Sequence, residues 1–124
     1  MPLLERDRQI LTHIEKYCEK IRHTVARFGA DFEIFLQDAD YRDSVSMNLL
    51  QIGELAGKLS GDYVAESKAT MNWRAIKAMR NLFAHDYGSM DLQRIWDTVL
   101  NDIPELQAYC DRELDLGLTE QSML

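Results

Sequence analysis

The sequence has only two cysteines and two prolines among its 124 residues. Cys18 and Cys110 are far apart and lack metal-ligand spacing, so we predict two buried free thiols, as expected in a reducing compartment. No apolar run approaches the ~20 residues that a membrane span needs. The first residues also lack the long apolar region of a secretory signal. We therefore expect a cytoplasmic protein that does not enter a membrane.

Familiar catalytic and cofactor motifs are also missing. The sequence has no Gly-rich phosphate loop, no G-x-S-x-G elbow and no paired-cysteine motif. His13 and His23 stand ten residues apart without carboxylate partners at ligand spacing, so we interpret them as surface histidines. A net charge of −7 argues against a general nucleic-acid coat protein. We therefore expect neither a metal nor a cofactor.

Helical periodicity is what the sequence does contain. Apolar residues recur at steps of three and four, whereas alternating polar–apolar runs and hairpin dipeptides are lacking. We predict an all-α fold, a single domain over residues 1–124 built as an up-and-down bundle of four main helices with short extra helices. Asp31 and Asn72 are expected to cap the helices that follow them, and Asp91 or Ser89 should cap the last one. Pro104 should interrupt this last helix. Helices are expected at about 4–27, 31–36, 39–59, 73–87 and 91–116, a short helix or a loop at 62–69, and a frayed tail at about 117–124.

The most unusual stretch ends the helix that starts near Trp73. One face of this helix is apolar, because Trp73, Ile76, Met79 and Phe83 recur at helical spacing. The same helix end carries a guanidinium, an amide, an imidazole and a phenol within eight residues, on Arg80, Asn81, His85 and Tyr87. This concentration of polar groups makes the helix end the candidate site.

Arg80 and His85 stand five residues apart, which is about 140° around an ideal helix. The two side chains converge only if the helix loosens between them, or if two chains bring their helix ends together in a symmetric dimer. A guanidinium clamps phosphate oxygens and an imidazole moves a proton near neutral pH, so the pair suits phosphodiester cleavage. The alternative is that Arg80 bonds the last carbonyls of its helix and His85 caps it.

A basic ridge leads to this site. Arg74, Lys77 and Arg80 repeat at steps of three, so they share one side of the helix. Such a ridge can hold RNA phosphates within an otherwise acidic protein. The alternative is an ordinary solvated helix face, which is the commoner use of lysine and arginine.

Glu54 is the one carboxylate that falls amid an apolar stripe, on the helix predicted at 39–59. A partly buried glutamate needs a partner, which either Arg80 or Arg42 could supply. The alternative is an ordinary pair with Lys58, four residues on, which we expect to be the commoner arrangement.

Two glycines, Gly53 and Gly57, lie four residues apart on the same helix. Each costs about 1 kcal/mol of helix propensity relative to alanine. A glycine that weakens a helix by this amount is usually offset by the close approach of another backbone, so this helix face should meet a partner helix.

The pattern R-x4-H-x-Y, filled by Arg80, His85 and Tyr87, resembles the signature of the HEPN superfamily and specifically the HepT-like toxins. Flanking blocks extend the resemblance from about Asp7 to Leu106. They are the segments 42–45 and 49–56, the run 73–76 that leads into Arg80-Asn81, and Trp96 followed by 103–106. A short R-x4-H alone is a weak signal, but these blocks follow in the family's order.

The resemblance implies a metal-independent endoribonuclease, the toxin of a type II toxin–antitoxin pair. Arg80 and His85 would be its catalytic residues, Asn81 and Glu54 would support them, and Arg74 and Lys77 would bind RNA phosphates. A homodimer would place two copies of the pair in one interface cleft.

The resemblance also implies a partner, an MntA-like nucleotidyltransferase antitoxin that silences the toxin by AMPylation of the motif tyrosine, here Tyr87. From the residues alone, Tyr87 could equally be a packing residue whose hydroxyl fixes the turn at Gly88. The competing hypothesis for the whole chain is a non-catalytic nucleotide- or partner-binding subunit of a minimal nucleotidyltransferase.

Overall fold

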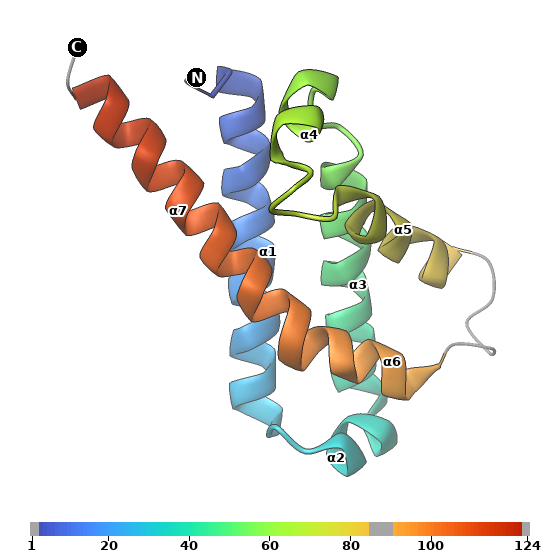
Figure 1. Ribbon diagram of the computed structural model, residues 1–124. Coiled ribbons are helices and arrows are strands. Elements are labelled where there is room, and N and C mark those ends of the chain that lie inside the picture. The colour runs from blue at the N-terminus through green and yellow to red at the C-terminus, as the bar shows by residue number, and fades with distance from the viewer. Residues whose placement is uncertain (1–2, 85–90, 123–124) are drawn as a thin grey trace.

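The computed structural model describes the backbone of residues 3–84 and 91–122 and the side chains of residues 3–80 and 91–115. Within these ranges the regular elements are all helical, which confirms the predicted all-α fold (Figure 1). In chain order they are α1 (Glu5–Phe28), α2 (Phe32–Gln37), α3 (Ala39–Ala56), α4 (Gly61–Ser67), α5 (Trp73–Ala84), α6 (Leu92–Asp97), the π-helical turn η1 (Thr98–Asp102) and α7 (Ile103–Ser122).

Four main helices, α1, α3, α5 and α7, build the bundle. Helices α1 and α3 run side by side, α7 crosses α1 obliquely, and α5 packs on α3 (Figure 1). The core between them contains the apolar stripes expected from the periodicity. Its fully buried members include Leu11, Ile14, Ile21, Val45, Ile52 and Ile103. Burial of such side chains contributes about 1.5–3 kcal/mol each.

The predicted caps hold the helix starts. Asp31 accepts a hydrogen bond from the backbone N–H of Glu33 and begins α2, and Asn72 accepts one from that of Ala75 at the start of α5. Asp91 caps α6 in the same way. Gly29 ends α1 with a φ of 112°, a conformation that side chains rarely adopt.

Pro104 interrupts the last helical segment as predicted. The chain widens into η1 just before it, so the missing N–H of proline falls where the helical hydrogen-bond pattern has already changed. Helix α7 then continues to Ser122 (Figure 1). The frayed tail expected at about 117–124 falls partly outside the described residues and stays a prediction.

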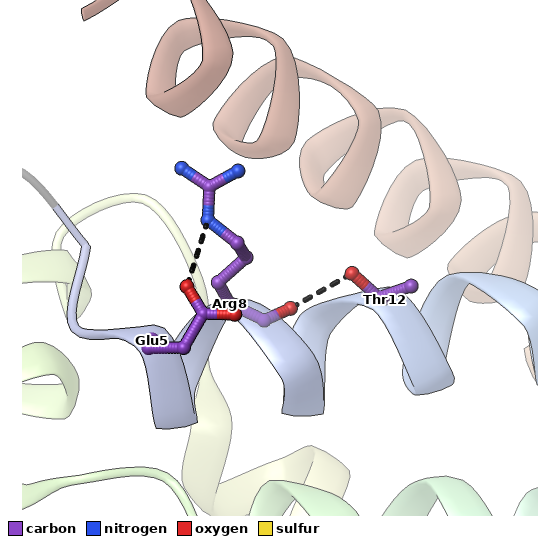
Figure 2. Close-up of polar contacts among 3 residues, drawn as sticks. All are labelled: Glu5, Arg8 and Thr12. Atoms are coloured by element: carbon purple, nitrogen blue, oxygen red, sulfur yellow. Dashed lines mark hydrogen bonds and ion pairs between the residues drawn. The ribbon is translucent and has the colours of Figure 1, made fainter. Parts of the chain in front are cut away.

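Two local contacts help to steady the start of α1. The Thr12 hydroxyl donates to the backbone carbonyl of Arg8, and the Arg8 Nε lies 3.8 Å from Glu5 Oε2. Figure 2 shows the Arg8 side chain standing up from α1, with Glu5 below its Nε. Such pairs three residues apart add only a few tenths of a kcal/mol.

Both cysteines are fully buried free thiols, as predicted. Burial is the main cause that raises the pKa of Cys18 to about 12, and it raises the pKa of Cys110 as well. Neither group is therefore a reactive thiolate at neutral pH.

Candidate active site at the end of helix α5

Helix α5 turns an apolar face to the core and a basic face to solvent. Trp73, Ile76 and Met79 are buried, whereas the side chains of Arg74, Lys77 and Arg80 are exposed. The predicted basic ridge therefore lies on the solvent side. This exposure fits an RNA-binding surface and an ordinary solvated face equally well, so the RNA contact stays a prediction.

The start of α5 is anchored by buried hydrogen bonds around α4. The indole Nε1 of Trp73 donates to the Ser67 hydroxyl (2.8 Å), which donates to the Tyr63 carbonyl (2.6 Å). The hydroxyls of Tyr63 and Tyr109 lie 2.6 Å apart. Burial raises the pKa of both phenols, so both stay protonated at neutral pH.

Asp7 on α1 extends this arrangement. Its carboxylate is 1% exposed and accepts two hydrogen bonds from Ser60, one from the backbone N–H (2.9 Å) and one from the hydroxyl (2.7 Å). The Ser60 hydroxyl in turn accepts from the N–H of Tyr63, which caps α4. We call these six residues the α4 network: Asp7, Ser60, Tyr63, Ser67, Trp73 and Tyr109. The network fixes where α5 begins.

At its other end, α5 comes unusually close to α3 at Gly53. A Cβ atom on Gly53 would lie 2.8 Å from the backbone N of Arg80 and 3.0 Å from its Cβ. The predicted close approach of another backbone is thus confirmed for Gly53, and Arg80 supplies that backbone. One turn further along the chain, at the C-cap of α3, a Cβ on Gly57 would lie 3.5 Å from Lys77 Cε, near the end of that side chain.

Glu54, next to that contact, pairs with the candidate catalytic cation. Its Oε1 lies 3.5 Å from Arg80 Nε. Both side chains are nearly half exposed, at 43% for Glu54 and 47% for Arg80. A pair this exposed contributes at most about 1 kcal/mol to stability. Its main consequence is geometric, because the contact is made at Nε, and a guanidinium carries further N–H donors on its two Nη groups.

Of the three candidate partners for Glu54, the structure selects Arg80. Arg42 instead donates from Nη1 to the backbone carbonyls of Phe35 and Leu36, which ties α3 to α2. Lys58 lies beyond the last residue of α3. The expectation that Lys58 is the commoner partner is therefore wrong here, because the closeness of α5 at Gly53 brings a stronger competitor within reach.

Two predicted site residues, His85 and Tyr87, lie outside the described residues. The backbone of Asn81 belongs to α5, but its side chain is outside the described set. The structure therefore brings together Arg80 and Glu54, with Lys77 and Arg74 along the same exposed helix. Whether His85 reaches Arg80 stays a prediction.

Elsewhere, a hollow of about 470 Å³ lies between α4 and the neighbouring parts of α1 and α7. It is lined by five of the six members of the α4 network, all except Trp73, together with Leu3, Leu4, Asp62, Glu66, Thr70 and Glu113. None of the predicted site residues that the structure describes borders it. In the described part of the chain, no group of three or more His, Cys, Asp or Glu side chains could hold a metal ion. No helix there is long and apolar enough to cross a bilayer.

The fold and the site define a small helical-bundle protein with an exposed, carboxylate-paired arginine at the end of a basic helix. The model of the ribonuclease HepT-like family matches residues 14–113, so the chain belongs to that family. The chain is therefore a ribonuclease by family, and the expected superfamily assignment is confirmed.

Individual relatives agree with this assignment. A protein of Caldanaerobacter subterraneus subsp. tengcongensis named "Putative RNase" is 31% identical over 84% of this chain and 90% of its own length. A "Probable ribonuclease HepT" of Thermococcus cleftensis is 33% identical over 61% of this chain and 68% of its own. A "Putative RNase" of Methanocaldococcus jannaschii is 29% identical over 59% and 60% of the two chains. No solved structure matches this chain.

Proposed function

We propose that the protein is a metal-independent endoribonuclease toxin whose cleavage site is formed by Arg80 and His85. The observation that carries the proposal is the exposed guanidinium of Arg80, held by Glu54 at Nε on the end of a basic helix. Its remaining N–H donors suit the non-bridging oxygens of a phosphate. Membership of the ribonuclease HepT-like family supplies the substrate class, RNA.

In the proposed reaction, the ribose 2′-oxygen attacks the adjacent phosphorus and the bond from phosphorus to the 5′-oxygen breaks. His85 takes the proton from the 2′-hydroxyl or delivers one to the leaving 5′-oxygen. Arg80 stabilises the charge that develops on the phosphorane. Asn81 orients the phosphate or the imidazole, and Glu54 orients Arg80.

A homodimer would complete this site. The chemistry uses one proton acceptor and one proton donor, and each chain offers a single motif histidine, His85. Two chains that meet at the ends of α5 would contribute two copies of His85 and of Arg80 to one cleft.

The partner that we propose is a nucleotidyltransferase antitoxin of the MntA type, which transfers AMP to Tyr87. Tyr87 lies two residues from His85, so a phosphodiester there adds bulk and negative charge beside the site. It would pair with Arg80 in place of the RNA phosphate. Mass spectrometry after co-expression with such an enzyme should show Tyr87 carrying AMP, and an unmodified tyrosine would contradict this part of the proposal.

RNA cleavage by the full chain, in the presence and absence of a chelator, tests the central claim. We expect the wild type to cleave in chelator, and Arg80→Ala and His85→Ala to lose at least about 10²-fold in kcat while staying folded. Arg6→Ala, a change of an exposed arginine on α1, is the matched control. Cleavage that survives in both site variants would exclude Arg80 and His85 as the catalytic pair. It would favour a binding subunit whose apparent activity is a contaminant.

The basic ridge is tested by the salt dependence of RNA binding. Lys77→Ala should weaken binding of a non-cleavable RNA regardless of its sequence, and it should lower the slope of log Kd against log salt by about 1. An unchanged slope would make the ridge an ordinary solvated face.

A further inference from the structure

Gly53 allows the closest contact between α3 and α5, and the atoms that it faces belong to Arg80. A Cβ at this position would meet the backbone N, the Cβ and the Cα of Arg80 at 2.8, 3.0 and 3.3 Å. Real Cβ atoms do not approach backbone atoms to 2.8 Å, and a backbone atom has no rotamer by which to move away. Any side chain at position 53 must therefore push the helix that carries Arg80.

Gly57, one turn away on the same helix, provides the contrast. A Cβ at this position would lie 3.5 Å from the Glu54 carbonyl oxygen and 3.5 Å from Lys77 Cε. Both distances are ordinary van der Waals contacts, and the nearest α5 atom belongs to the end of a flexible side chain. Alanine at 57 is thus accommodated where α5 stands, and the φ of −68° at this position suits any residue.

The neighbouring Glu54 makes the position of α5 chemically important. Its carboxylate reaches Arg80 Nε at 3.5 Å, close to the 4 Å limit of an ion pair. A shift of α5 by a few tenths of an ångström away from α3 lengthens this contact and turns the guanidinium. Gly53 therefore determines the position of the Arg80 backbone, and Glu54 determines the position of its guanidinium.

We propose that Gly53 is a positioning residue for the ribonuclease reaction: by lacking a side chain, it seats the Arg80 backbone against α3 so that Glu54 can orient the guanidinium toward the scissile phosphate. This inference rests on the proposed catalytic role of Arg80. Misplacement of a catalytic group by 1 Å can cost about 10²-fold in rate, so a displacement of about half that size should cost about tenfold.

The test compares Gly53→Ala with Gly57→Ala in the full chain. We expect Gly53→Ala to lower kcat by about tenfold or more while KM changes less than about threefold, because Arg80 acts mainly on charge that develops in the transition state. Gly57→Ala should stay within about twofold of the wild type. Val45→Ala, which removes buried methyl groups from α3 eight residues before Gly53, measures how far lost stability alone affects the rate.

A second measurement is independent of RNA cleavage. The Nε–H resonance of Arg80, assigned by its disappearance in Arg80→Lys, reports on the contact with Glu54. Gly53→Ala should move this resonance to its position in Glu54→Gln, and Gly57→Ala should leave it at the wild-type position.

The two measurements separate failure of this inference from failure of the proposed function. An unshifted Arg80 resonance in Gly53→Ala overturns the positioning role, whether or not the protein cleaves RNA. A kcat for Gly53→Ala that equals the wild-type value, or that falls only as far as in Val45→Ala, also overturns it. If Arg80→Ala cleaves as fast as the wild type, the proposed catalytic role of Arg80 is wrong. The Arg80 resonance still decides whether Gly53 positions the Arg80 side chain.

Discussion

The two ends of α5 hold their polar groups in opposite ways. At the start, the indole of Trp73 is 4% exposed and bonds Ser67 inside the α4 network. Seven residues later, Arg80 is about half exposed and contacts Glu54 at 3.5 Å, in a geometry that water can compete with. Buried hydrogen bonds are costly to break because the orphaned partner stays buried, whereas exposed ion pairs are cheap to break.

Because of this difference, the residues at the start of α5 determine mainly stability, and those at its other end determine mainly the proposed reaction. The α4 network fixes the start of α5, and the apolar face of α5 holds the helix against α3. The cation at the far end is left exposed and is paired with Glu54. Substitutions in the network should reduce stability far more than the intrinsic rate, and substitutions at the exposed end should do the reverse.

Asp7→Ala should show the largest effect on the buried side. It removes the acceptor of both Ser60 bonds and leaves a partly buried N–H and a partly buried hydroxyl without their partner on α1. We expect a loss of about 3 kcal/mol in the free energy of unfolding, measured by urea denaturation, with kcat per folded molecule within about twofold. Asp62→Ala, which removes an exposed carboxylate on α4, is the control and should cost under about 0.5 kcal/mol. Equal losses in the two variants would contradict the structural role of the network.

Arg80→Lys gives the reverse pattern at the exposed end. Lysine keeps the charge but lacks the planar fork, so it cannot hold Glu54 and a phosphate with separate edges. We expect kcat to fall about 10²-fold while the unfolding free energy changes by under about 0.5 kcal/mol. Arg94→Lys, on the exposed side of α6, should leave both quantities unchanged within error. A stability loss as large as that of Asp7→Ala would break the distinction between the two ends.

Tyr109→Phe should have a smaller effect, again on stability. It removes one hydroxyl from a buried pair and leaves the Tyr63 hydroxyl without that partner. We expect a loss of about 1–2 kcal/mol in urea denaturation. Tyr17→Phe removes the same group from a partly exposed position on α1 and should cost much less. A neutral outcome for Tyr109→Phe would mean that water from the adjacent hollow replaces the lost hydroxyl.

The sequence was sufficient for the helices and much of the core because both follow from local pattern. Asp31, Asn72 and Asp91 were identified as caps from residue type and position, and the structure confirms all three. The interruption at Pro104 was likewise predictable, because proline lacks the N–H that a helix interior needs. These features depend on neighbours a few residues away in the chain.

The contacts between distant segments could not be predicted in this way. Periodicity places Glu54 on a helix face but does not show which helix packs against that face. The sequence therefore favours Lys58 as the ion-pair partner of Glu54, whereas the structure shows Arg80. Gly53 signalled a close approach without naming the approaching residue. The bonds between Asp7 and Ser60, 53 positions apart, had no local signal at all. The family resemblance, by contrast, rested on ordered motifs and was confirmed.

The smallest expected effect is the pH dependence of stability that the two buried cysteines cause. In the folded protein, burial keeps Cys18 and Cys110 protonated, with the pKa of Cys18 raised to about 12, whereas the unfolded chain ionises its thiols near pH 8.5. As the pH rises toward and past that value, the unfolded state binds fewer protons than the folded state, so the free energy of unfolding should fall.

We expect the free energy of unfolding to fall by about 1 kcal/mol or less between pH 7 and 8.5 for the two thiols together. Urea denaturation at both pH values checks this, and the Cys18→Ala/Cys110→Ala double variant should lose the pH dependence. A slope that persists in the double variant would assign it to other groups.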